Sequence, residues 1–371
     1  MRKDIMILLN PGPVNLTERV RAALALPDLC HREREFGELQ DEIRRRLLEV
    51  YSLPPERWAP VLVSGSGTAA VEAMLGSLVP RDGRLLVIDN GVYGARLADI
   101  AGCHGIAHAV ARQAWGTPVD LDALARHLDA QPGFTHVAIV QHETSTGRLN
   151  DVAAVGYLCR ERNIALLVDA VSSFGAEALE FDAWGVTACA ASANKCLHGA
   201  PGVSLVIVRR GALPDGGGGR SVYLDLARHC RAQDARDTAF TPAVPIFYAL
   251  REALREFEDQ GGWRMRHERY RRLAEVVEEG FVRLGVAPLL REGERSVVLR
   301  AYHLPDGLDY AALHDGLKQR GFVIYAGQGK LAASIFRVST MGAIDAADMQ
   351  RFLDAVAGLL GPARLSSAQA R

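Results

Sequence analysis

The chain has 371 residues, of which 49% are hydrophobic, and this exceeds the length at which one core stops growing, so two domains are expected. Its 43 basic and 44 acidic residues leave a formal net charge of −1, which excludes an overall field for capturing nucleic acid or an anionic membrane. The six cysteines are scattered without a C-x-x-C pair, and no apolar run reaches the roughly 18 residues of a membrane span, so we expect a cytoplasmic protein with reduced thiols.

Short apolar runs alternate with helical patterns from about residue 58 to residue 210. This alternation predicts an α/β fold, in which a mostly parallel sheet carries helices on both faces. Ligands of such sheets gather where the strands end. The seven expected strands are 58–64, 84–90, 107–112, 136–142, 164–169, 188–192 and 203–209, with helices such as 69–78 and 152–162 between them.

The pattern changes after the run from Gly216 to Gly219 and predicts a smaller α+β unit, which is separated from the sheet domain within the helical stretch after Pro242. We expect an N-terminal segment at 1–15, a large domain at 16–255 and a small C-terminal domain at 256–371, with 361–371 as a frayed tail. The run from Gly216 to Gly219 predicts a solvent loop or a mobile flap over a site. The C-terminal elements are helices near 244–260, 263–284, 309–320 and 345–360 and strands near 297–304, 321–325 and 335–339.

A turn rich in glycine and hydroxyl groups, Ser64-Gly65-Ser66-Gly67-Thr68, follows the first strand and precedes a helix. Glycine lets the backbone approach a phosphate, whose charge the free amides of a helix N-terminus stabilise. A simple N-capped turn is the alternative. The turn has neither the lysine of a P-loop nor the G-x-G-x-x-G pattern of dinucleotide sites.

Two other strand ends carry side chains suited to a flat ring. Tyr93 follows the second strand and could stack on such a ring, although a core or surface tyrosine is the alternative. The segment Thr144-Ser145-Thr146 places hydroxyl groups after the fourth strand, within reach of a phenolate oxygen.

An aspartate and a lysine form the most specific pattern. Asp169 ends the apolar strand 164–169, where an unpaired carboxylate would cost on the order of several kcal/mol. Lys195 follows 26 residues later (195 − 169) in an apolar turn bounded by glycine, which favours its deprotonation. Pyridoxal phosphate chemistry needs both groups, a lysine for the Schiff base and a carboxylate that keeps the pyridine nitrogen protonated. A helix cap and a solvated lysine are the alternatives.

An arginine and two histidines complete the set of candidates. Arg337, in the strand 335–339, lies on the face opposite its apolar neighbours, which is typical of an anion clamp or a structural salt bridge. His104 and His108 are four residues apart, as in a helical zinc pair, but Gly105 between them argues against a helix. We therefore expect no metal.

Taken together, these motifs resemble the class V aminotransferases of PLP fold type I over nearly the full length. That resemblance implies a large domain with a seven-stranded, mostly parallel sheet and a smaller C-terminal α+β domain. The matching segments are Leu9-Asn10-Pro11-Gly12-Pro13, Ser64-Gly65-Ser66-Gly67-Thr68, Asn90-Gly91-Val92-Tyr93-Gly94-Ala95-Arg96, Glu143-Thr144-Ser145-Thr146-Gly147, Val168-Asp169-Ala170-Val171-Ser172-Ser173-Phe174-Gly175, Ser192-Ala193-Asn194-Lys195-Cys196 and Gly321-Phe322-Val323-Ile324-Tyr325.

The resemblance also implies roles for single residues and a homodimer with sites at the subunit interface. Lys195 would carry the cofactor and Asp169 would pair with its ring nitrogen, so both are expected to be catalytic. Thr241 would reach the phosphate bound by the neighbouring subunit. The implied cofactor-binding residues are Ser66, Gly67, Thr68, Tyr93, Thr146, Asp169, Ser192, Lys195 and Thr241, and the implied substrate-binding residues are Gly12, Arg32 and Arg337.

Within that family, the wording Ser192-Ala193-Asn194-Lys195-Cys196 is most similar to enzymes that move the amino group of 2-aminoethylphosphonate to pyruvate, giving phosphonoacetaldehyde and L-alanine. The segment 30–36, with His31 and Arg32, is closer to the glyoxylate-using branch, and Arg32 either binds a phosphonate or is a solvated loop arginine. The alternatives are an alanine- or serine–glyoxylate aminotransferase, a transaminase of a related aminophosphonate, a PLP lyase, and an α/β binding module without the cofactor.

Overall fold

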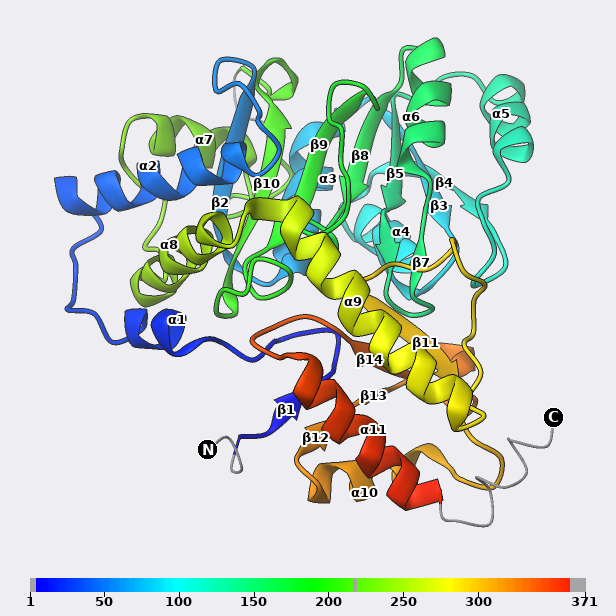
Figure 1. Cartoon of the computed structure of the whole chain (residues 1–371). Helices are drawn as coiled ribbons and strands as arrows, with labels where there is room; N and C mark the ends of the chain where they lie inside the picture. The colour runs from blue at the N-terminus through cyan, green and yellow to red at the C-terminus, as the bar shows by residue number, and fades with distance from the viewer. Residues whose placement is uncertain (1–4, 216–218, 361–371) are drawn as a thin grey trace.

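Seven strands form the central sheet of the computed structural model, which describes residues 5–215 and 219–360 (Figure 1). The predicted frayed tail, 361–371, and residues 216–218 of the glycine run lie outside the described residues. The strand order is β2-β10-β9-β8-β5-β3-β4. The strands are β2 (Trp58–Gly65), β3 (Arg84–Asp89), β4 (Ala107–Arg112), β5 (His136–Val140), β8 (Ala165–Asp169), β9 (Val186–Ser192) and β10 (Gly202–Arg209).

All neighbouring pairs in this sheet are parallel except those of β10, which runs antiparallel to β2 and β9. The α/β class and the mostly parallel sheet of seven strands are thus confirmed. The reversal at β10 follows from its connection, because 193–201 between β9 and β10 is too short for a parallel crossover. Lys195 lies in this tight connection.

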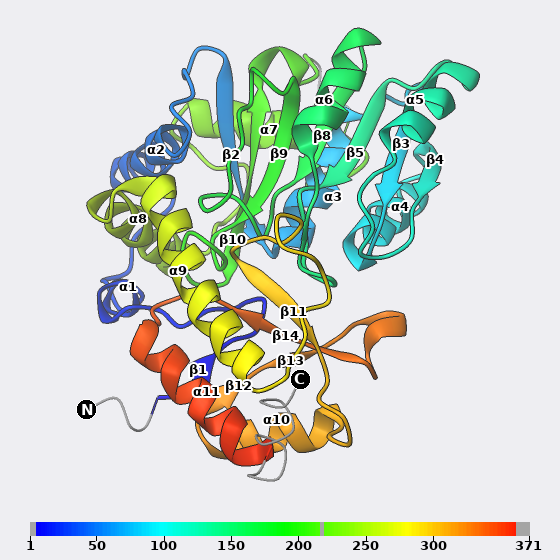
Figure 2. The same cartoon turned by 45° about the vertical axis from the view of Figure 1, so that its right-hand side comes forward.

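Helices cover both faces of the sheet (Figure 2). Adjacent residues of β5 show this directly, since Ala138 packs in one apolar core and Ile139 in the other. One core includes side chains of α2, α5, α6 and α8, and the other includes side chains of α3, α4 and α7. These helices are α2 (Arg34–Glu49), α3 (Gly67–Leu78), α4 (Val92–Cys103), α5 (Leu121–Ala130), α6 (Val152–Glu161), α7 (Leu226–Asp234) and α8 (Val244–Asp259), after a short α1 (Glu18–Ala23).

Several helices begin at an aspartate that accepts a hydrogen bond from a backbone amide of the first turn. Asp120, Asp151 and Asp225 act in this way for α5, α6 and α7, and Asp309 does so for a helix of the C-terminal part, α10 (Tyr310–Gln319). Such caps satisfy an amide that has no partner inside the helix. The sequence therefore encodes these helix starts locally.

The C-terminal elements form a second unit, which α9 joins to the sheet (Figure 1). Its three-stranded antiparallel sheet has the order β11-β14-β13. The elements are α9 (Gly262–Arg283), β11 (Leu299–His303), α10 (Tyr310–Gln319), β12 (Phe322–Val323), β13 (Tyr325–Ala326), a 3-10 turn η2 (Gly329–Leu331), β14 (Ile335–Ser339) and α11 (Ala346–Leu360). Another 3-10 turn, η1 (Arg210–Ala212), follows β10 of the central sheet.

The N-terminal strand belongs to this second unit. β1 (Ile7–Leu8) pairs in parallel with β12, and Ile7 and Leu9 are buried in the same core as side chains of α9 and α11. The expected strand at 321–325 is divided, because β12 pairs with β1 whereas β13 pairs with β14. The three-part domain division stays a prediction.

No helix among the residues that the structure describes is long and apolar enough to span a membrane.

Candidate active site

A small cavity lies beyond the carboxyl ends of β5 and β8, where the fold predicts a ligand site. Tyr93, Asp169 and Lys195 all line it. These residues come from three separate segments, so the fold brings together side chains that the sequence shows more than 20 residues apart. The other lining residues are Val140, His142, Thr144, Val171 and Ser172.

Asp169 ends β8 and is only 6% exposed. Its Oδ1 accepts a hydrogen bond from the amide of Val171 at 2.9 Å. Among the described residues it has no ion pair closer than 4 Å, and burial raises its pKa to about 6, against the lowering effect of Val171 and of the charges of Arg96 and Lys195. A buried carboxylate of this kind can pair with a cationic ring nitrogen, and the positive charge of that nitrogen would favour the ionised form of Asp169.

The amine of Lys195 donates a hydrogen bond to the carbonyl oxygen of Pro11. Burial, helped by the charges of Arg337 and Arg96, lowers the pKa of Lys195 to about 8, against the raising effect of Cys196 and Asp169. The neutral amine that forms a Schiff base is therefore accessible near physiological pH.

The N-terminal segment passes over this lysine at Gly12. A Cβ atom at Gly12 would lie 2.7 Å from Nζ of Lys195, and the backbone there has φ +110°. Glycine is thus required both by the close approach and by the backbone conformation. The predicted substrate-binding position Gly12 is beside the reactive amine.

The turn before α3 has the shape of a phosphate cradle. Gly67 begins the helix, and a Cβ atom there would lie 2.5 Å from Cγ1 of Val171 and 3.4 Å from Cβ of Ser192. Ser66, at the N-cap, makes no side-chain capping bond, so the first amides of α3 are available to an anion. Thr68 follows in the first turn. The predicted set Ser66, Gly67, Thr68 and Ser192 is therefore gathered next to the ring site, and it fits the phosphate arm of the cofactor.

Tyr93 is positioned by a residue that sequence reasoning missed. The carboxylate of Glu143 accepts hydrogen bonds from the amides of Tyr93 and Gly94 at 3.1 Å each and from the hydroxyl of Ser145 at 2.6 Å. Burial raises the pKa of Glu143 to about 7. A Cβ atom at Gly91 would lie 2.3 Å from this side chain. In the sequence, Gly91, two residues before Tyr93, was the feature that could have indicated a side chain packed closely against this turn.

The threonine that lines the cavity differs from the predicted one. Thr144 lines the cavity, whereas the hydroxyl of Thr146 donates to the carbonyl oxygen of Glu143 at 3.3 Å and accepts from the amide of Arg148 at 3.4 Å. The role predicted for Thr146 at the ring hydroxyl stays a prediction, and Thr144 is the threonine better placed for it.

His142 was also missed. It lines the cavity, its Nδ1 lies 3.1 Å from the hydroxyl of Ser172, and its buried Nε2 has no hydrogen-bond partner among the described residues. Burial lowers its pKa to about 4, so the ring is neutral at physiological pH. No spacing in the sequence marked it, because its importance depends on the neighbouring strand end.

Arg337 is 2% exposed in β14 and is held by neutral acceptors. Its Nε donates to the carbonyl oxygen of Ala326 at 2.8 Å, and one terminal nitrogen donates to Thr144 O at 3.0 Å and to Gln328 Oε1 at 3.1 Å. No carboxylate of the described residues lies within 4 Å, so the salt-bridge alternative is not realised. Burial lowers its pKa, and a substrate carboxylate would compensate this buried charge.

The structure places two predicted residues, Arg32 and Thr241, among other partners. Arg32 forms an ion pair with Asp237 at 2.7 Å and donates to the carbonyl oxygen of Thr238 at 2.8 Å. Thr241 is exposed and lines a separate small cavity with Ser64. A single chain does not bring them to Lys195, and their roles stay predictions.

The two histidines of the rejected zinc pair are not on one helix. α4 ends at Cys103, His104 contacts Glu72 at 2.7 Å, and His108 lies in β4.

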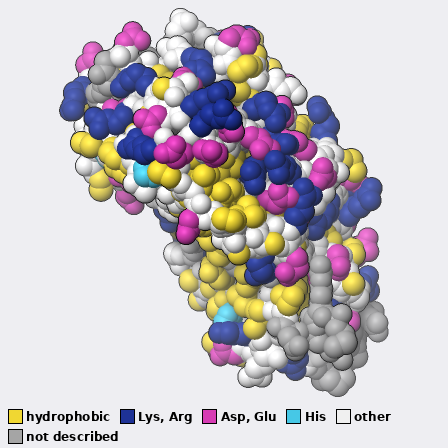
Figure 3. All heavy atoms as spheres, turned by 90° about the vertical axis from the view of Figure 1, so that its left-hand side faces the viewer, with side chains coloured by type: hydrophobic (Ala, Val, Ile, Leu, Met, Phe, Trp, Pro, Cys, Tyr) yellow, Lys and Arg dark blue, Asp and Glu magenta, His cyan; other side chains and the backbone are white. Residues whose placement is uncertain are grey.

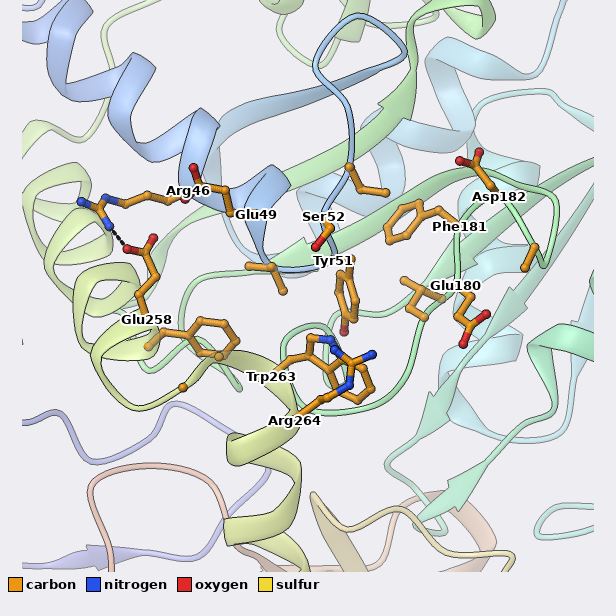
Figure 4. Close-up of a pocket in the computed structure, with 17 residues that line it drawn as sticks. Arg46, Glu49, Tyr51, Ser52, Glu180, Phe181, Asp182, Glu258, Trp263 and Arg264 are labelled. Atoms are coloured by element: carbon orange, nitrogen blue, oxygen red, sulfur yellow. Dashed lines mark hydrogen bonds and ion pairs between the residues drawn. The ribbon is translucent and has the colours of Figure 1, made fainter.

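A larger cavity, of about 560 Å³, lies between α2 and the start of α9 (Figure 4). Tyr51 and Trp263 contribute an aromatic wall, with ring centres 5.7 Å apart. Its carboxylates are largely paired, Glu258 with Arg46 and Asp182 with arginines beside it. None of the predicted site residues lines it.

Comparisons with known proteins identify the family of the chain. The model of the family "Aminotransferase class-V" matches residues 24–352. A 2-aminoethylphosphonate–pyruvate transaminase of Vibrio cholerae serotype O1 is 38% identical over 360 residues, covering 95% of this chain and 97% of the relative. The transaminase of the same description from Syntrophobacter fumaroxidans is 36% identical, covering 94% of this chain and 95% of the relative.

A solved structure shows the same fold. The alanine–glyoxylate aminotransferase of Nostoc sp. superimposes with a TM-score of 0.91 at 29% identity, covering 96% of each chain. The family model, the relatives and this structure all match nearly the full length, and the solved structure has the fold described above. The chain therefore belongs to the class-V aminotransferases.

Proposed function

We propose that this enzyme moves the amino group of 2-aminoethylphosphonate to pyruvate and so gives phosphonoacetaldehyde and L-alanine. The observation that carries an aminotransferase reaction is the single cavity lined by Lys195, Asp169 and Tyr93. The donor and acceptor are supported by the description of the Vibrio cholerae relative, which is 38% identical over 95% of this chain. The cofactor of class-V aminotransferases is pyridoxal phosphate.

Bound pyridoxal phosphate supplies a carbonyl carbon that takes up the amino group and a ring that accepts electrons. The pKa of Lys195 is lowered to about 8. Its Nζ would take a proton from the donor carbon and deliver it to the cofactor carbon that takes up the amino group. The carboxylate of Asp169 would hold a proton on the ring nitrogen. Tyr93 would cover one face of the ring and exclude water from it.

Arg337 would bind the carboxylate of pyruvate. Its guanidinium is buried, faces neutral oxygen acceptors and has no carboxylate partner within 4 Å among the described residues. A planar carboxylate could accept two parallel hydrogen bonds from it. In the reverse half of the reaction the same arginine would hold the carboxylate of alanine.

We further propose a homodimer in the cytoplasm. Ser66 and Thr241, both predicted to contact the cofactor phosphate, are exposed in the single chain, which supports a cradle completed by a second copy. Figure 3 shows hydrophobic side chains gathered below a belt of charged ones on the side where α1, α2 and α8 lie. Leu26, three residues after the end of α1, is 40% exposed. A surface of this kind is suited to a subunit interface.

The test is the absorbance of the cofactor-loaded enzyme, titrated with 2-aminoethylphosphonate. Loss of the near-visible band, and its return when pyruvate is added, is the expected result for both half-reactions. A band that ignores this amine but responds to alanine or serine would move the donor to the glyoxylate branch, which the segment 30–36 favours. Product formed without any keto acid would indicate a lyase, and absence of a band would contradict the role of Lys195.

A further inference from the structure

Arg96, in α4, is a partly buried arginine beside the phosphate cradle. One terminal nitrogen lies 3.4 Å from the hydroxyl oxygen of Thr68. Its guanidinium carbon lies 4.6 Å from the ring centre of Tyr93. The two side chains that it contacts are therefore one from the predicted phosphate set and one from the predicted ring set.

The charge of Arg96 is not neutralised by the protein nearby. No carboxylate among the described residues lies within 4 Å of its nitrogens, and the bond to Thr68 is long for a charged donor. Its charge nevertheless reaches the site, since it lowers the pKa of both Asp169 and Lys195. Arg96 is thus a cation within electrostatic range of both catalytic groups.

The cradle itself lacks a cation. Ser66, Gly67, Thr68 and Ser192 offer amides and hydroxyl groups, and this turn has no lysine of the P-loop kind. A phosphate monoester carries between one and two negative charges near neutral pH. Hydrogen bonds from neutral donors leave much of that charge uncompensated, and a guanidinium is the side chain best shaped to share it.

We propose that Arg96 binds the phosphate group of the cofactor, with the guanidinium turned from Thr68 to the phosphate oxygens and still in contact with the ring of Tyr93. The proposal rests on the proposed cofactor site but not on the identity of the amino donor. Two other roles compete with it. Arg96 could serve only to support Tyr93, or it could face the phosphonate of the donor, which has the same charge and shape.

The test compares cofactor binding with and without the phosphate group. The apo-enzyme is titrated with pyridoxal phosphate and, separately, with pyridoxal, and absorbance reports binding of each. In Arg96→Gln, the Kd of pyridoxal phosphate is expected to rise about 10- to 100-fold, as for loss of a charged hydrogen bond. The Kd of pyridoxal is expected to stay nearly unchanged.

Arg84→Gln is the matched control. Arg84 begins β3 at the end of the strand remote from the site, and its guanidinium lies 4.3 Å from the ring centre of Phe134. The Arg84→Gln variant therefore loses a comparable contact between a guanidinium and an aromatic ring, and it leaves the phosphate cradle unchanged. Both Kd values are expected to remain those of the wild type.

Two outcomes would overturn the proposal. Equal weakening of pyridoxal and pyridoxal phosphate in Arg96→Gln would reduce Arg96 to a support for Tyr93. Unchanged cofactor affinity together with a raised KM for 2-aminoethylphosphonate would assign it to the donor. Because the binding titrations contain no amino donor, an error in the proposed donor leaves them unaffected.

A second variant, Arg96→Lys, keeps the proposal testable if Arg96→Gln fails to fold. Arg96→Lys keeps the charge, so it is expected to retain a larger part of the preference for pyridoxal phosphate over pyridoxal. In the wild type, inorganic phosphate is expected to compete with pyridoxal phosphate but not with pyridoxal, and weaker competition in Arg96→Lys would follow. Competition by phosphate that is identical in the two proteins would contradict a contact with Arg96.

Discussion

The cavity around Lys195 is smaller than the cavity beside Trp263, and the two differ in how their polar groups are satisfied. In the smaller cavity, Asp169 is buried and has no ion pair within 4 Å among the described residues, and Lys195 has a lowered pKa. In the larger one, the rim carboxylates of Glu258 and Asp182 are paired with arginines. Buried ionisable groups without a charged partner therefore indicate a catalytic site better than the volume of a cavity does.

Replacing Lys195 tests the smaller cavity most severely. In Lys195→Ala, turnover is expected to fall by about 10⁴-fold or more, because the attachment point and the proton carrier are lost together. The near-visible band of the loaded enzyme is expected to disappear, and a transamination assay with the absorbance spectrum checks both. Retained turnover would contradict the assignment.

The substitution Asp169→Asn is expected to have opposite effects on turnover and on the stability of the apo-enzyme. Turnover is expected to fall by about 100- to 1000-fold, since the amide cannot compensate a charged ring nitrogen. The folded pKa of Asp169, about 6, lies above its ordinary value of 3.8, so its ionised form destabilises the folded apo-enzyme above pH 6, and this cost fades as the pH falls toward 4.

The same variant should therefore stabilise the apo-enzyme. The gain in unfolding free energy is expected to reach at most about 3 kcal/mol at pH 8 and to shrink at pH 5. Thermal unfolding of apo-enzyme at both pH values measures it. If the gain in unfolding free energy were instead larger at pH 5 than at pH 8, ionisation of Asp169 would not destabilise the folded apo-enzyme.

Arg337→Gln should affect acceptor binding before chemistry. The KM for pyruvate is expected to rise about 100-fold, as when one partner of a buried charge pair is removed. The charge of Arg337 also lowers the pKa of Lys195, so the pKa in the pH dependence of cofactor attachment is expected to move above about 8. A change in kcat alone, with the KM and this pKa unchanged, would argue against a substrate contact.

Tyr51→Phe tests the larger cavity and should have the smallest effect. The hydroxyl of Tyr51 donates to Glu177 O at 2.7 Å and accepts from the amide of Gly175 at 2.9 Å. Losing both bonds is expected to cost about 1 to 3 kcal/mol of stability, measured by denaturant unfolding. Turnover and cofactor affinity are expected to stay those of the wild type, and a large loss of either would make this cavity part of the site.

The sheet and the central pair of residues could be predicted from local sequence. Apolar runs of strand length defined the seven strands within a few residues, and Asp169 and Lys195 were recognisable because each follows or ends such a run. The antiparallel direction of β10 was not predicted, although the short connection after β9 encodes it.

Residues whose role depends on contacts between distant elements could not be predicted. Glu143 reaches the amide of Tyr93 across 50 positions of sequence, and Arg96 contacts Thr68 only because α4 packs beside the first turn of α3. Thr144 and Thr146 are two residues apart, and only the fold of the hairpin β6 (His142–Glu143) and β7 (Arg148–Leu149) decides which one lines the cavity.

The pairing of β1 with β12 has a consequence for the order of assembly. The partners Ile7 and Phe322 are separated by 315 residues (322 − 7), and the segment after β1 carries Pro11 and Gly12 across the amine of Lys195. On the ribosome, the central sheet can form long before β12 emerges, because domains fold as their residues become available. The segment that covers the lysine gains its strand partner only near the end of synthesis, so the proposed active site is among the last parts of the chain to be completed.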